Sequence, residues 1–163
     1  ISRIFSIQAH NLSAVPLLAE YISRNIELDN PVVIGPDEES EQWAAAAARV
    51  LGVDFDVLEK KRINAERVEI KTRRLNVKNR DVAVIDDIIS TGGTMVETVK
   101  VLRREGARKI VVGCIHPVLV GNALARLFDS GADIVLGTDS IPSPISRVGL
   151  APTIASALRK VKE

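Results

Sequence analysis

Short apolar runs of strand length alternate along this chain with segments in which apolar residues recur at helical spacing. The clearest run is residues 82–85, where consecutive apolar side chains are typical of a strand buried on both faces. Strands that alternate with helices form parallel βαβ units, because a parallel connection needs a crossover. We therefore expect an α/β fold, a three-layer parallel β-sheet flanked by helices.

The same pattern gives the positions of the individual elements. We expect strands at residues 31–35, 55–59, 81–86, 109–115 and 133–137. We expect helices at residues 13–25, 40–51, 94–105, 122–130 and 152–162. No repeat, linker or second domain boundary interrupts the order, so residues 1–163 are expected to form a single domain.

One segment, residues 60–80, does not follow this alternation. It combines short alternating apolar pieces with many basic residues: Lys60, Lys61, Arg62, Arg67, Lys71, Arg73, Arg74, Lys78 and Arg80. We expect a hairpin or flap outside the sheet, with residues 62–76 as its mobile part. From the residues alone, the simpler reading of Lys60, Lys61 and Arg62 is a solvated basic turn.

Composition narrows the classes of partner. The chain has 22 Lys plus Arg and 21 Asp plus Glu, so its net charge of +1 creates no overall attraction to nucleic acid or to an anionic membrane. Residues 110–125 form the longest uncharged run, which is shorter than a membrane span. Cys114 is the single cysteine, so an intrachain disulfide is impossible and a reducing, cytoplasmic location is expected.

The stretch at residues 84–94 carries the strongest chemical signal. A buried strand leads into Asp86 and Asp87 and then into a loop of small and hydroxylic residues, namely Ser90, Thr91, Gly92, Gly93 and Thr94. Ligands of parallel sheets bind beyond the carboxyl ends of the strands, and glycines allow the backbone to approach them closely. Amides at the start of the following helix then bind anions. The sequence therefore predicts a phosphate site.

The paired carboxylates indicate what else the ligand carries. Asp86 and Asp87 add negative charge beside an anion site, which is useful only if they accept hydrogen bonds from hydroxyl groups or hold a divalent cation. A sugar phosphate offers hydroxyls and phosphate in one molecule. The plainer alternative is that the two acids end the strand and the glycines form an ordinary turn.

Residues 84–94 resemble the 5-phosphoribosyl 1-diphosphate (PRPP) binding signature of the type I phosphoribosyltransferases and PRPP synthetases. Other segments resemble the ribose-phosphate pyrophosphokinases, particularly their archaeal branch. Residues 59–62 (Glu-Lys-Lys-Arg) match the position of the catalytic Lys-Arg-Arg type motif, and residues 33–37 (Val-Ile-Gly-Pro-Asp) match a strand that ends at a magnesium ligand. The His-Pro-Val and Gly-Asn-Ala segments at residues 116–123 also match.

This resemblance implies a type I phosphoribosyltransferase-like fold and transfer of the diphosphoryl group of ATP to the C1 hydroxyl of ribose 5-phosphate. It implies that Lys60 stabilises the transition state and that Arg62 clamps phosphate. Asp37 would bind Mg²⁺, and Asp86 and Asp87 would hold the ribose hydroxyls. The resemblance also implies a dimer or higher homo-oligomer. From the balanced charge, we expect no nucleic acid or membrane partner.

The resemblance further implies that part of the enzyme lies outside this chain. Residues 1–25 are expected to be the end of an N-terminal domain, which contributes much of the ATP pocket in the family, together with a linking helix. The isolated chain would then bind the sugar phosphate with little turnover of ATP.

Two departures from the family pattern and two rival functions accompany this hypothesis. Ser90 stands where many relatives have an acid, and residues 38–40 (Glu-Glu-Ser) replace a small glycine-rich pair. Asp37 could be a plain helix cap. The rival functions are a type I phosphoribosyltransferase that uses PRPP and a non-catalytic regulatory module of the same fold.

Overall fold

The structure, a computed structural model, describes residues 9–62, 68–73 and 75–161, and for residues 60–62, 68–71 and 161 it describes the backbone alone. Its strands are β1 (Val32–Gly35), β2 (Phe55–Arg62), β3 (Val68–Thr72), β4 (Asp81–Ile89), β5 (Lys109–Pro117), β6 (Ile134–Thr138) and β7 (Ser146–Val148). Its helices are α1 (Val15–Asn25), α2 (Glu41–Leu51), α3 (Gly93–Arg104), α4 (Ala123–Asp129) and α5 (Ala151–Val161).

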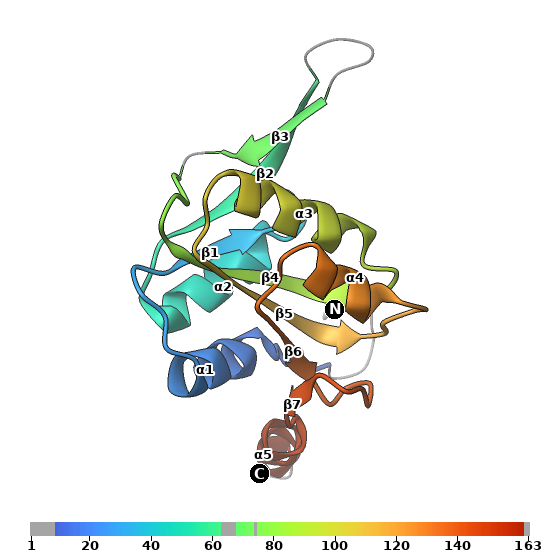
Figure 1. Ribbon diagram of the computed structural model, residues 1–163. Coiled ribbons are helices and arrows are strands. Elements are labelled where there is room, and N and C mark those ends of the chain that lie inside the picture. The colour runs from blue at the N-terminus through green and yellow to red at the C-terminus, as the bar shows by residue number, and fades with distance from the viewer. Residues whose placement is uncertain (1–8, 63–67, 74, 162–163) are drawn as a thin grey trace.

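The strands form one sheet in the order β3-β2-β1-β4-β5-β6-β7 (Figure 1). Every neighbouring pair is parallel except β2 and β3, which are antiparallel. The α/β fold with a parallel sheet is therefore confirmed.

Helices cover both faces of the sheet, and β4 shows why its sequence is apolar throughout. Val82 and Val84 pack into a cluster with α3 and α4, whereas Ala83 and Ile85 pack into a second cluster with α1 and α2. Successive side chains of a strand point to opposite faces, so a strand between two helical layers needs apolar residues at every position. The predicted three layers follow from this packing.

The order of the strands across the sheet reverses between β1 and β4: β2 and β3 lie on one side of β1, and β4 to β7 lie on the other. From β1 the chain passes through α2 to β2 on one side, and it returns through β3 to place β4 on the other side of β1. The connections on either side of this point lie on opposite faces, α2 on one and α3 on the other. In sheets of this kind, the loops after two such strands diverge and leave room for a ligand at their carboxyl ends.

The basic segment forms a hairpin of β2 and β3, but the prediction that it lies outside the sheet is wrong. β2 pairs with β1 and β3 is the antiparallel edge strand of the same sheet, because the chain folds back directly onto β2 (Figure 1). The outer part of the predicted flap, residues 63–67 and 74, lies outside the described residues. The described part that follows β3 is bound to the domain: the Leu75 amide donates to Asp56 (2.9 Å), and Val77 is buried.

Most expected elements are present with shifted ends. β4 and β5 run to Ile89 and Pro117 and thus continue past their predicted ends. β7 was not predicted, because three residues are too few to show a strand pattern. Among the described residues, no helix combines the length and the hydropathy needed to cross a membrane.

Candidate functional site

A pocket of about 190 Å³ lies at the carboxyl ends of β1 and β4, where the order of the strands reverses. We call it the β1/β4 pocket. It is lined by Asp37, Asp86, Ile88, Ile89, Ser90, Thr91, Gly92, Gly93, Thr94 and Met95. The crossover thus places Asp37 beside the loop after β4 that is predicted to bind phosphate. Most of the predicted binding residues line this one pocket.

Asp37 is held in a compact turn between β1 and α2. Its Oδ1 accepts a hydrogen bond from the Ser40 amide (3.1 Å), and its own amide donates to Ser40 Oγ (3.1 Å). Gly35 permits this turn, because a Cβ there would collide with Ser40 Oγ and lie 3.0 Å from Val57. Asp37 therefore closes the turn before α2 and also lines the pocket, so its structural and ligand-binding readings are compatible.

Asp86 is the most perturbed carboxyl group of the pocket. Burial and the nearby charges of Asp87 and Asp37 raise the pKa of Asp86 to about 7, although the Asp87 amide donates to its Oδ1 (2.9 Å) and acts in the opposite direction. Asp87 is half-buried but does not line the pocket in this structure. Among the described side chains, those that line the pocket include two carboxylates and no basic group, so a cation or a set of hydroxyl donors would relieve the repulsion between the carboxylates.

The loop after β4 has the geometry of an anion cradle. Gly92 has φ +76° immediately before α3, a conformation that favours glycine. No acidic side chain lies in the first turn of α3, whose leading amides have no partner within the helix. Ser90, Thr91 and Thr94 are exposed and add hydroxyl donors. This combination suits a phosphate group.

Lys60 and Arg62 lie on β2, where their backbones pair with Ile70 and Val68 of β3. Their side chains lie outside the described part of the structure, so their predicted roles stay predictions. Their strand is the neighbour of β1, whose end carries Asp37.

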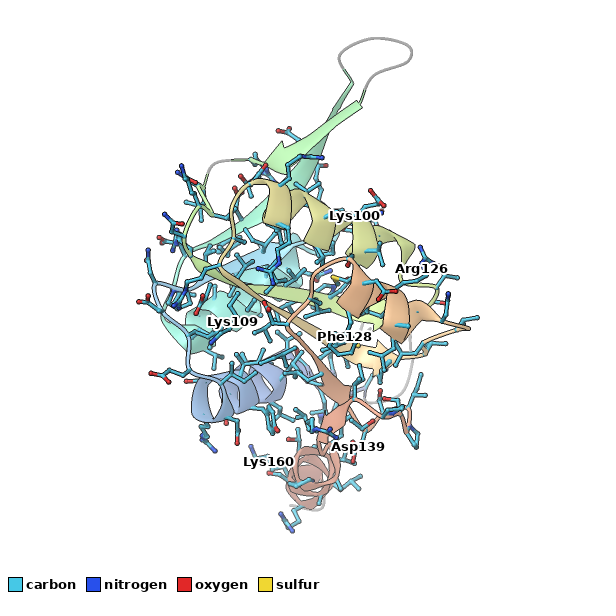
Figure 2. All side chains as sticks on the ribbon, viewed as in Figure 1. Lys100, Lys109, Arg126, Phe128, Asp139 and Lys160 are labelled. Atoms are coloured by element: carbon cyan, nitrogen blue, oxygen red, sulfur yellow. The ribbon has the colours of Figure 1, made fainter. Side chains whose placement is uncertain are left out.

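Several residues that line the pocket or contact the loop could not be identified from the sequence. Ile88, Ile89 and Met95 line the pocket, but each reads as an ordinary apolar residue in the sequence. Arg126 of α4 donates to the Thr91 carbonyl (3.3 Å), and nothing in the sequence links these two residues. Figure 2 shows that Arg126 belongs to the helix on the α3 side of the sheet.

The donor set fits Mg²⁺ only together with a ligand. Within the described ranges, no group of three His, Cys, Asp or Glu side chains could hold a metal by itself. Asp37 and Asp86 supply two carboxylates to the pocket. Mg²⁺ in phosphoryl-transfer sites is commonly held by one or two carboxylates, with water and substrate phosphate oxygens completing the shell. The pocket is compatible with that arrangement.

A comparison with family models finds one match that covers most of the chain. The model described as "Phosphoribosyl transferase domain" matches residues 6–141. The matched region contains both strands that form the β1/β4 pocket.

Curated relatives cover nearly the whole chain. It is 40% identical over 159 residues to the ribose-phosphate pyrophosphokinase of Methanopyrus kandleri and 42% identical over 159 residues to that of Methanothermobacter thermautotrophicus. Each alignment covers 98% of this chain and 55% of the relative. The chain thus spans about half the length of the curated relatives it matches.

Solved structures show the same relationship. Phosphoribosylpyrophosphate synthetase from Mycobacterium smegmatis matches with a TM-score of 0.74 and 28% identity, over 91% of this chain and 50% of that one. Adenine phosphoribosyl transferase from Trypanosoma brucei matches with a TM-score of 0.60 and 18% identity, over 81% of this chain and 68% of that one, and supports the fold alone.

Proposed function

Because this chain belongs to the phosphoribosyl transferase domain family, we propose that it is the ribose 5-phosphate-binding part of a ribose-phosphate pyrophosphokinase. The observation that carries the proposal is the β1/β4 pocket, in which Asp37 and Asp86 stand beside the loop of residues 90–94 that leads into α3. Two relatives with this name, about 40% identical to the chain, support the proposed reaction. In that reaction, ATP gives its diphosphoryl group to the C1 hydroxyl of ribose 5-phosphate.

The two ends of the sugar phosphate would contact different parts of the pocket. The 5-phosphate would accept hydrogen bonds from the amides around Gly92 and Gly93 and from the hydroxyls of Ser90, Thr91 and Thr94. The ribose hydroxyls would donate to Asp86 and Asp87. A donor to Asp86 favours its ionised form, so sugar binding would lower the raised pKa of this carboxyl group.

Asp37 and Asp86 would hold the Mg²⁺ that accompanies the phosphorylated substrates. Bound there, the ion would neutralise charge on the phosphate oxygens. Asp37 is pre-positioned for this role by its hydrogen bonds with Ser40, which fix the carboxylate at the edge of the pocket.

Lys60 and Arg62 would stabilise the transferring diphosphoryl group. Attack at phosphorus increases charge on the non-bridging oxygens, so cations close to them lower the barrier. The planar guanidinium of Arg62 suits a bidentate contact with phosphate. Both residues lie on β2, in the hairpin that could close over the site and exclude water.

Turnover would require the part of the relatives that this chain does not span. We propose that residues 1–25 connect the domain to that part and that the complete enzyme is a homo-oligomer. α1 itself packs in the core of this domain, where Leu18 and Ile22 are fully buried. The isolated chain would then bind ribose 5-phosphate while converting little ATP.

Calorimetry with ribose 5-phosphate, PRPP and ATP tests this function. We expect ribose 5-phosphate to bind in the micromolar to millimolar range and Asp86→Asn to weaken it. Asp129→Asn on the exposed side of α4 is the matched control and should bind normally. Conversion of PRPP and a free base to a nucleotide would favour the phosphoribosyltransferase, and failure to bind any sugar phosphate would favour a non-catalytic module.

A further inference from the structure

The loop after β4 is hydrogen-bonded along one side to residues 119–126. Three consecutive carbonyls of the loop accept hydrogen bonds from this segment. The Leu119 amide donates to Ile89 (3.0 Å), the Val120 amide donates to Ser90 (3.0 Å), and Arg126 Nη1 donates to Thr91 (3.3 Å).

These three contacts determine where the loop amides point. The structure has no cis peptide bond among its described residues, and in a trans peptide the carbonyl of one residue and the amide of the next point in opposite directions. With the carbonyls of residues 89–91 directed at the 119–126 segment, the amides of Ser90, Thr91 and Gly92 are directed away from it. The pocket lies on that side, since no residue of the 119–126 segment lines it.

Arg126 differs from the other two donors in being a side chain. Leu119 and Val120 act through backbone amides, which a substitution other than proline retains. Arg126 is exposed on a helix in which Ala123 and Leu127 make the buried contacts. Removing its side chain therefore opens no cavity in the core, yet it frees the Thr91 carbonyl, whose peptide partner is the Gly92 amide.

We propose that Arg126 is a positioning residue for the phosphate-binding loop: its guanidinium holds the Thr91 carbonyl and so keeps the Gly92 amide directed at the ligand. Its charge also favours an anion on the other side of the same peptide. The proposal rests on the proposed function, because it assigns Arg126 to the binding of the sugar's phosphate end.

The test compares Arg126→Ala, Arg126→Lys and the control Arg104→Ala. Arg104 is an exposed arginine at the end of α3 that lies away from the loop. The Arg104→Ala substitution therefore removes the same charge without changing a contact of the loop. The readouts are the Kd of ribose 5-phosphate by calorimetry, the NMR shifts of the Ser90, Thr91 and Gly92 amides during titration with inorganic phosphate, and the melting temperature.

We expect Arg126→Ala to weaken ribose 5-phosphate binding about tenfold, as for the loss of one charge-assisted contact. The phosphate-induced shift of the Gly92 amide should shrink, and millimolar guanidinium should restore part of the affinity. Arg126→Lys should bind with intermediate affinity, because it retains the charge. Melting temperatures of all variants should match that of the parent chain.

Three results would overturn the proposal. The first is an unchanged affinity of Arg126→Ala for ribose 5-phosphate, and the second is an equal loss of affinity in Arg104→Ala. The third is a loss of affinity in Arg126→Ala that accompanies a lower melting temperature and is not restored by guanidinium. If the parent chain binds neither ribose 5-phosphate nor inorganic phosphate, the proposed function fails together with the role of Arg126. Normal binding by both the parent and Arg126→Ala would remove only the role of Arg126.

Discussion

Asp37 and Asp86 line one pocket, although Asp37 follows β1 and Asp86 lies near the end of β4. Their proximity arises because β1 and β4 are neighbours at the point where the strand order reverses. Burial of Asp86, together with the charges of Asp87 and Asp37, raises its pKa to about 7. A carboxyl group whose pKa is raised by burial opposes folding once it is ionised.

Asp86→Asn should stabilise the ligand-free domain above neutral pH. The native pKa of Asp86 is about 7, against about 3.9 for an unfolded aspartate, so the native state binds the extra proton between these values. The parent chain therefore loses stability as the pH rises from about 4 to 7, and the variant lacks this loss. We expect a gain on the order of 1–3 kcal/mol at pH 8 and none near pH 4.

Urea unfolding at a series of pH values measures this effect. Asp129→Asn, an exposed position of α4, should show no such pH-dependent gain. If Asp86→Asn were no more stable than the parent at pH 8, the raised pKa would be wrong.

Asp81→Asn should destabilise the domain without affecting the pocket. Asp81 is fully buried, and it accepts hydrogen bonds from Arg108 Nε (2.8 Å) and from the Asp29 amide (2.8 Å). Burial alone would raise its pKa, but these hydrogen bonds and the charges of Arg108 and Lys109 outweigh burial and lower the pKa of the carboxyl group. We expect a loss of about 1–3 kcal/mol at pH 7.

The contribution of Asp81 to the stability of the domain changes with pH in the opposite direction from that of Asp86. A lowered pKa contributes stability above the unfolded value of about 3.9, and this contribution disappears as the pH falls through the native pKa. The difference between Asp81→Asn and the parent should therefore shrink in acid. Asp81 begins β4 and Asp86 lies near its other end, so ribose 5-phosphate affinity should be unchanged. Exposed Asp54→Asn serves as the control.

Gly92→Ala should impair ligand binding and stability together. Gly92 has φ +76°, and a Cβ there would lie 3.4 Å from the Ala123 Cβ. Alanine in this backbone region costs about 1–2 kcal/mol, and any relaxation moves the loop amides. We expect at least a tenfold loss of ribose 5-phosphate affinity by calorimetry, on the order of one hydrogen bond to a charged group.

Gly52→Ala provides a matched control. Gly52 has φ +69° after α2, but a Cβ there would meet nothing within 4 Å. The Gly52→Ala variant should lose a similar amount of stability and retain full affinity for ribose 5-phosphate. Equal affinity losses in the two variants would mean that stability alone, and not the geometry of the loop, governs binding.

Lys60→Ala should separate catalysis from binding. If Lys60 stabilises the transferring diphosphoryl group, then in a protein restored to the full length of its relatives kcat should fall by at least about a hundredfold. Ribose 5-phosphate affinity should change little. Lys78→Ala, at an exposed position after the hairpin, should retain activity. A parallel loss of kcat and of sugar affinity would contradict the assigned role.

The central part of the fold was predictable because its strands are buried on both faces. Residues 82–85 have no polar position, and a run this short that is rich in β-branched residues favours a strand between two layers. β7 and the exact extent of the hairpin were not predictable in the same way. β7 has three residues at the edge of the sheet, where one face of packing leaves little pattern.

The pocket was predictable where its chemistry is continuous in sequence, at residues 86–94, and at Asp37 through the family resemblance. The partners of that loop were not. Arg126 reaches Thr91 through the packing of α4 beside α3, and Arg108 reaches Asp81 because their strands are neighbours. Long basic side chains adopt many rotamers, so sequence patterns do not specify which carbonyl or carboxylate they contact.

The most direct measurement is a crystal structure of this chain with ribose 5-phosphate. We expect the sugar in the β1/β4 pocket, with phosphate oxygens about 3 Å from the amides of residues 90–93 and ribose hydroxyls at a similar distance from Asp86 or Asp87. A saturated crystal in which the pocket remains empty, or in which those amides turn away from the phosphate, would contradict this expectation.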